Sequence, residues 1–107
     1  GADLPNAGFN VLVIEETERR GDLNESQKSA IFGVDLQSIV RNAGGKMRVW
    51  DQDVDASKEP SEWFRAALKV PHESLPWLVV ANGKRVSSKP LPTTKEEILA
   101  EVGKYAK

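Results

Sequence analysis

Oxygen-bearing side chains recur at short intervals near the middle of the chain, where they could hold a metal ion. They are Asp51, Asp53, Asp55, Ser57, Glu59 and Glu62. Counted from the first, they stand at positions 1, 3, 5, 7, 9 and 12, which is the ligand spacing of a calcium-binding loop. The pattern therefore raises a calcium site as one interpretation, with the ligands Asp51, Asp53, Asp55, Ser57 and Glu62.

Three features of this loop favour a different interpretation. Ala56 stands at position 6, where the sharp turn of a calcium loop needs glycine. Lys58 occupies position 8, which is usually apolar. A strand, not a helix, is expected to precede the loop. We therefore predict a solvated strand-to-helix connection whose carboxylates complement the helix N-terminus, with weak calcium binding as the alternative and no cofactor.

The chain lacks the side chains of thiol chemistry. It has no cysteine, which excludes disulfides, thiolate metal sites and thiol nucleophiles. His72, the only histidine, lies close to Ser74 in sequence. A hydrolytic triad also needs a third group that orients the base, and no G-x-S-x-G elbow is present. We predict no catalytic residue, and thiol–disulfide oxidoreductase activity is excluded because the chain has no cysteine.

Four segments of the sequence predict strands. Residues 9–14 form a continuous, partly β-branched apolar run, typical of a central strand covered on both faces. Further strands are predicted at 47–49, 76–81 and 84–88. The last two are joined by Asn82-Gly83, the strongest hairpin signal in the chain.

The first helical region is predicted in two stretches. Asn24 or Ser26 can cap a helix that runs to about residue 32, and Gly33 then interrupts it. Asp35 can cap a second stretch, which ends at Gly44-Gly45 as a C-cap.

Two later helices have their own start signals. Pro60 suits the first turn of a helix that carries Trp63 and Phe64 on its apolar face. Thr94 and Glu97 have capping-box spacing for the last helix.

These elements predict one α/β domain at 9–107, after a flexible lead-in at 1–8. The order β-α-β-α-β-β-α makes the first two strands parallel, with a right-handed crossover, and the last two antiparallel. We therefore expect a mixed four-stranded sheet with helices on both faces.

Particular residues add to this layout. The run 74–84 places a proline at the start of a buried strand and Asn-Gly at its end. Asp53-Val54-Asp55 precedes Pro60, and the last helix follows Pro92. In these respects the chain resembles the thioredoxin-like superfamily over residues 9–107.

The resemblance implies a thioredoxin-like fold with a cis peptide bond before Pro76. In that family a Cys-x-x-Cys motif opens the first helix, and the motif's position falls here at either 20–23 or 32–35. The alignment stays open, but neither stretch contains cysteine. The resemblance therefore implies a redox-inactive member.

The resemblance also implies a binding role, because the family's cis-proline loop exposes backbone groups that can pair with an extended peptide. We expect a peptide or protein segment as the partner, held between two walls. The expected wall residues are Leu75, Pro76 and Trp77 on one side, and Arg19, Arg20 and Asp22 of the polar loop 15–23 on the other. The alternatives are a structural module, or a non-thiol enzyme that binds a small molecule such as glutathione. The enzyme is disfavoured because the only tyrosine, Tyr105, lies in the last helix.

Charge and hydropathy exclude other partners. The 15 basic and 16 acidic residues are well mixed, whereas duplex-binding proteins concentrate positive charge, so we expect no nucleic acid. The longest apolar runs, such as 77–81, are far below the roughly 20 residues that span a bilayer. No signal-peptide pattern opens the sequence. We expect a soluble monomer without membrane contact, in a compartment that the sequence does not specify.

Overall fold

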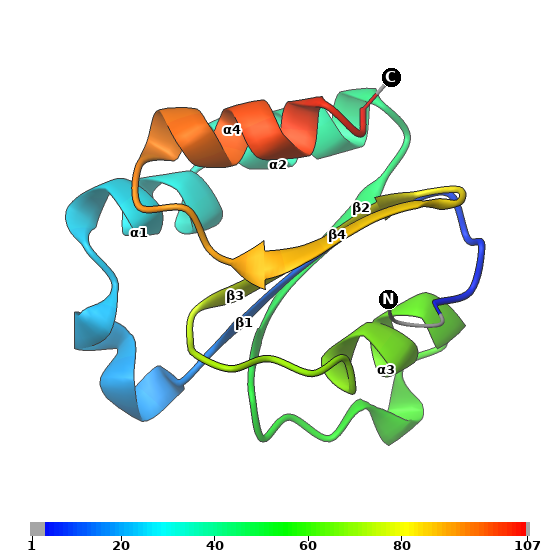
Figure 1. Cartoon of the computed structure of the whole chain (residues 1–107), viewed down its shortest axis with the longest axis horizontal. Helices are drawn as coiled ribbons and strands as arrows, with labels where there is room; N and C mark the ends of the chain where they lie inside the picture. The colour runs from blue at the N-terminus through cyan, green and yellow to red at the C-terminus, as the bar shows by residue number, and fades with distance from the viewer. Residues whose placement is uncertain (1–3, 107) are drawn as a thin grey trace.

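The computed structural model of the chain describes residues 4–106, except for the side chains of residues 19, 20 and 22. Four strands and four α-helices make up this part of the chain (Figure 1). None of the helices described is long and apolar enough to cross a membrane. Of the predicted lead-in, residues 4–8 are described, and Leu4 packs partly buried against the core.

A four-stranded mixed sheet forms the centre of the molecule. The strands β1 (Phe9–Glu15), β2 (Lys46–Asp51), β3 (Trp77–Asn82) and β4 (Arg85–Pro90) lie in the order β2-β1-β3-β4. β1 pairs parallel with β2 and antiparallel with β3, and β3 pairs antiparallel with β4. The prediction of an α/β domain with a mixed four-stranded sheet is confirmed.

Helices cover both faces of the sheet. The helices α1 (Glu25–Phe32), α2 (Val34–Asn42) and α4 (Lys95–Gly103) lie on one side, and α3 (Glu62–Leu68) lies on the other (Figure 1). Successive residues of β1 serve the two faces. Its odd-numbered apolar residues join the core beneath α1, α2 and α4, and its even-numbered ones join the core beneath α3. All of β1 is buried for this reason, as its continuous apolar run predicted.

The first helical region breaks where the sequence predicted. Asn24 caps α1 by accepting the N–H of Gln27, and the Gln27 side chain accepts the N–H of Asn24, which completes a capping box. α1 ends at Phe32, and Gly33 separates it from α2. The helical region that the predicted element order places between the first two strands therefore contains two helices, α1 and α2.

The later helices are held by side-chain caps. Ser61 Oγ accepts the N–H of Phe64 at the start of α3, one residue after the proline that signalled this helix. Thr94 Oγ1 accepts the N–H of Glu97 at the start of α4. Near the end of α4, Glu101 lies 3.0 Å from Lys89 of β4, an ion pair that ties α4 to the sheet margin.

The β3–β4 hairpin turns one residue later than its sequence signal suggested. The loop residues are Gly83 and Lys84, and Gly83 has φ of +66°, a value that favours glycine. Asn82 remains in β3, and its side chain donates to the carbonyl of Tyr105 at 2.6 Å. Asn82 therefore fixes the C-terminal segment and does not form the turn.

Candidate functional site

The segment after β1, predicted as a polar loop, is a short 3-10 helix, η1 (Thr17–Asp22). Glu15 itself belongs to β1, where it is paired with Asp51 of β2. The Thr17 N–H donates to Asp51 Oδ2 at 2.7 Å, and Glu18 lies in the first turn. Because carboxylates satisfy the free N–H groups at a helix start, Asp51 supports a turn that the polar sequence alone did not predict.

A groove of about 600 Å³ lies at the end of the sheet where β1 ends and β3 begins. Leu75 and Pro76 line it opposite Leu23, which follows η1. The Leu75–Pro76 bond is cis, as the resemblance implied. We call this feature the cis-proline groove.

The groove takes in some of the predicted partner-binding residues. Leu75 and Pro76 line it, and both are partly exposed. Trp77 is only 7% exposed, packs in the core beneath α3, and donates from Nε1 to Ser88 Oγ at 2.8 Å.

On the opposite wall, the predicted Arg19, Arg20 and Asp22 belong to η1, but their side chains lie outside the described residues. Glu18, from the same turn, does line the groove.

The described lining of the groove is acidic. Its ionisable side chains are Glu15, Glu16, Glu18, Glu73 and His72. The His72 ring is held by the backbone, with Nδ1 at 2.9 Å from the carbonyl oxygen of Val70. No lysine or arginine is among the described lining residues. The described part of the lining thus suits a cationic ligand better than an anionic one.

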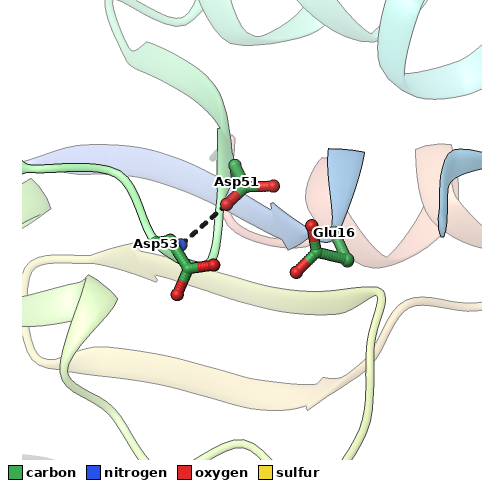
Figure 2. A group of neighbouring side chains, drawn as sticks. All are labelled: Glu16, Asp51 and Asp53. Atoms are coloured by element: carbon green, nitrogen blue, oxygen red, sulfur yellow. Dashed lines mark hydrogen bonds between the residues drawn. The ribbon is translucent and has the colours of Figure 1, made fainter. Parts of the chain in front are cut away.

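Three carboxylates gather beside the groove. Ligand-type oxygens of Glu16, Asp51 and Asp53 all lie within 4.8 Å of one another (Figure 2). The oxygens of two of them, Asp51 and Glu16, already accept hydrogen bonds. Asp51 accepts the N–H groups of Thr17 and Asp53, at 2.7 and 2.8 Å, and Glu16 accepts from the Gln52 side chain. These bonds hold the Asp51 and Glu16 carboxylates in place and draw the backbone of Asp53 toward Asp51.

The calcium ligands that the spacing suggested are distributed differently. Asp51 and Asp53 are in the carboxylate group, where Glu16 joins them from the end of β1. Asp55 instead caps the short 3-10 helix η2 (Ala56–Lys58), with Oδ1 accepting the N–H of Ser57 at 3.0 Å. That hydrogen bond lowers the pKa of Asp55. Glu62 lies in the first turn of α3.

Sequence spacing missed Glu16, although a signal for it exists. The first two strands were predicted to be parallel, and the carboxyl ends of parallel strands meet at one edge of a sheet. Glu16, directly after β1, and Asp51, the last residue of β2, therefore come together.

Acid should weaken the fold through Asp51. The backbone N–H of Thr17, followed by that of Asp53, lowers the pKa of Asp51 from 3.8 to about 2. A carboxyl with a lowered folded-state pKa contributes stability above its unfolded pKa and loses it as pH falls. We expect this contribution to disappear between about pH 4 and pH 2. An NMR titration of the Asp51 carboxyl carbon measures the pKa directly.

Asp51→Asn provides the matched control for this titration. Its unfolding free energy should fall less between pH 5 and pH 2.5 than that of the parent protein. An equal fall in the two proteins would contradict the assignment of this acid dependence to Asp51.

No family model, no curated protein and no solved structure matches this chain.

Proposed function

We propose that this chain is a redox-inactive, thioredoxin-like domain that binds an extended peptide segment in the cis-proline groove. Three features support the proposal. A cis proline precedes the strand β3, the first helical segment after β1 borders the same groove, and the sequence contains no cysteine. Leu23 lines the groove, whereas Phe32 lies away from it in the α1–α2 region, which favours 20–23 as the position of the family's motif.

The observation that carries the proposal is the state of the main chain at Ser74 and Leu75. Pro76 accepts the N–H of Leu91 at 3.1 Å. For Ser74 and Leu75, by contrast, no main-chain hydrogen bond outside the helices and strands is found among the described residues. Both residues line the groove. An extended peptide could pair with their N–H and C=O groups as an added strand does.

The acidic side chains of the cis-proline groove favour peptides that carry basic residues. Four glutamates line it, and the exposed ones, Glu18 and Glu73, stand on opposite walls. A lysine or arginine side chain between them would gain from both carboxylates. The proposed ligand is therefore an extended segment that carries basic residues.

A peptide titration tests this function. The probe is an extended peptide of alternating lysine and serine, added to the ¹⁵N-labelled protein and followed by amide NMR. We expect saturable shifts at Ser74, Leu75 and the residues of η1. Glu73→Gln should weaken binding about two- to fivefold, and Glu18→Gln with Glu73→Gln about tenfold, because each exposed ion pair contributes up to about 1 kcal/mol.

Glu96→Gln is the matched control, because Glu96 is an exposed glutamate on α4 away from the groove. It should bind the peptide like the parent protein. If the basic peptide causes no shifts near Leu75, or if Glu96→Gln weakens binding as much as Glu73→Gln does, the proposal is wrong.

A further inference from the structure

A second groove lies along the edge of the sheet that β2 forms. It measures about 620 Å³ and runs between the helices α1 and α2 and the strand β2. Its apolar lining includes Phe32, which is 46% exposed, together with the half-buried Met47 and Val49. We call it the edge groove.

The edge groove adjoins main-chain groups that point away from the sheet. β2 is an edge strand, because it pairs with β1 on one side and with no strand of the described chain on the other. The N–H of Gln52, directly after β2, donates to the carbonyl of Glu15 in β1. The main-chain N–H and C=O groups of successive strand residues point to opposite sides of the strand. Because the N–H of Gln52 points toward β1, the main-chain groups of the even-numbered residues of β2 also point toward β1. Those of Met47 and Val49 therefore point away from the sheet.

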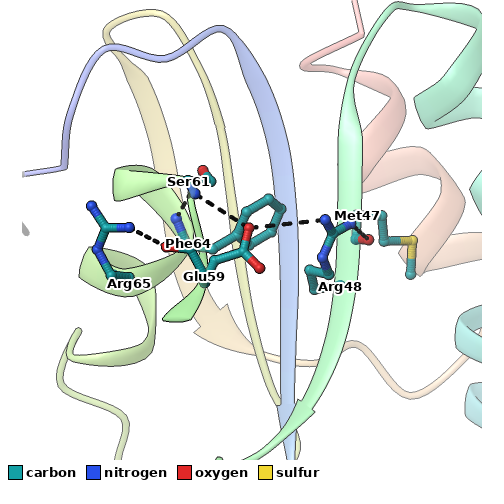
Figure 3. Close-up of polar contacts among 6 residues, drawn as sticks. All are labelled: Met47, Arg48, Glu59, Ser61, Phe64 and Arg65. Atoms are coloured by element: carbon teal, nitrogen blue, oxygen red, sulfur yellow. Dashed lines mark hydrogen bonds and ion pairs between the residues drawn. The ribbon is translucent and has the colours of Figure 1, made fainter. Parts of the chain in front are cut away.

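The position of Arg48 agrees with this assignment. Its Nη1 donates to the carbonyl of Met47 at 3.1 Å, which places that carbonyl on the open edge (Figure 3). Its Nη2 is 3.9 Å from Glu59, and the guanidinium lies 5.1 Å from the centre of the Phe64 ring. The Arg48 guanidinium therefore stands at the margin of the sheet, on the face that α3 covers.

The edge groove is basic. Its lining includes Arg41, Lys46 and Arg48, and no acidic residue is among the described residues that line it. Arg41 and Lys46 are exposed. This is the opposite of the charge in the cis-proline groove.

We propose that the open edge of β2 is a docking site for an extended acidic segment of another protein, which adds to the sheet as a fifth strand. Its main chain pairs with Met47 and Val49. Its apolar side chains enter the edge groove beside Phe32, and its acidic side chains meet Lys46 and Arg48. Strand addition supplies affinity through the main chain, and the alternating side chains supply specificity.

Charge argues against a second copy of this chain as the occupant. Pairing β2 with β2 of another copy would bring Lys46 and Arg48 of both copies together. The other open edge, β4, carries Arg85 and Lys89. Like charges placed opposite each other destabilise strand pairs, and basic residues on sheet edges oppose self-association. An acidic strand meets neither obstacle.

The test uses a peptide of alternating valine and glutamate, about nine residues long, to cover the six residues of β2. Added to the ¹⁵N-labelled protein, it should shift the amides of Met47 and Val49 and leave those near Leu75 in place. Binding should weaken with added salt, because the charges are exposed. A peptide with lysine in place of glutamate should not shift these amides.

Two matched comparisons separate strand addition from charge attraction alone. N-methylation at the alternate residues that face β2 should abolish binding, whereas N-methylation at the residues facing away should not. Lys46→Glu should weaken binding about tenfold, and Lys84→Glu, on the β3–β4 hairpin, should not weaken it.

Three results would overturn the inference. One is the absence of shifts at Met47 and Val49 at millimolar peptide. The second is equal binding of both N-methylated peptides. The third is a concentration-dependent shift of these amides without any peptide, which would identify a second copy as the occupant.

Discussion

Replacing Trp63 by alanine is expected to lower the free energy of unfolding by about 3–5 kcal/mol, whereas replacing it by phenylalanine should cost about 1 kcal/mol or less. Trp63 is fully buried on α3. Its ring packs edge-on against Phe64, with centroids 5.1 Å apart. Alanine would remove this packing and leave a large cavity.

The difference between the two replacements comes from the indole N–H of Trp63. Nε1 is buried, and it finds no hydrogen-bond acceptor in the described part of the chain. A buried donor without an acceptor costs about 1–3 kcal/mol of stability. Phenylalanine keeps most of the aromatic packing and removes this donor, so the loss of contact area is largely offset.

Trp77 supplies the matched comparison. Its Nε1 donates to Ser88 Oγ at 2.8 Å, so Trp77→Phe removes a hydrogen bond that is made. We expect Trp77→Phe to cost at least as much as Trp63→Phe, although Trp63 is the more buried residue. Denaturant unfolding of the three variants measures the differences. A cost for Trp63→Phe as large as that for Trp63→Ala would contradict the argument.

Trp77 shows where sequence patterns stop being informative. β3 is apolar at every position from Trp77 to Ala81, so it has no alternation that could assign Trp77 to one face. The resemblance led us to expect Trp77 in one wall of the cis-proline groove. Pairing of β3 with β1 and β4 instead directs the Trp77 side chain into the core beneath α3.

Features that depend on neighbouring residues were predicted more accurately than contacts between residues far apart in sequence. The strand β1, a cap at Asn24 or Ser26 and the break at Gly33 were all predictable, because each depends on neighbouring residues. The two glycines after α2 show the limit. Gly44 has φ of +76°, as a C-cap requires. Gly45 serves another purpose, since a Cβ there would lie 2.6 Å from the Phe9 ring, a contact that no local pattern contains.

The candidate site required the tertiary fold. The cis-proline groove combines the end of β1, the η1 turn and the segment before β3, which lie far apart in sequence. Its cis proline was predictable from the resemblance. The acidity of its described lining was not, because Glu73 and Glu18 come to line the same groove only after the sheet has formed. The edge groove was missed for the same reason, since its two sides come from the α1–α2 pair and from β2.

The junction between α1 and α2 should tolerate glycine alone. A Cβ at Gly33 would lie 2.3 Å from the carbonyl oxygen of Ser29, in the last turns of α1. That atom belongs to the backbone, so the clash is relieved only if the end of α1 shifts. We expect Gly33→Ala to lower the free energy of unfolding by about 1–3 kcal/mol, the usual cost of overpacking.

Gly103→Ala gives the matched control, with an effect of opposite sign. A Cβ at Gly103, in the last turn of α4, would meet nothing within 4 Å. Because alanine favours helix over glycine by up to about 1 kcal/mol, this variant should be neutral or more stable. Denaturant midpoints of the two variants test the prediction, and equal changes in both would contradict it.

Phe32, next to Gly33, lines the edge groove. A displaced α1 should therefore also weaken binding of the acidic peptide while leaving the basic peptide unaffected, which connects this backbone constraint to the proposed docking site.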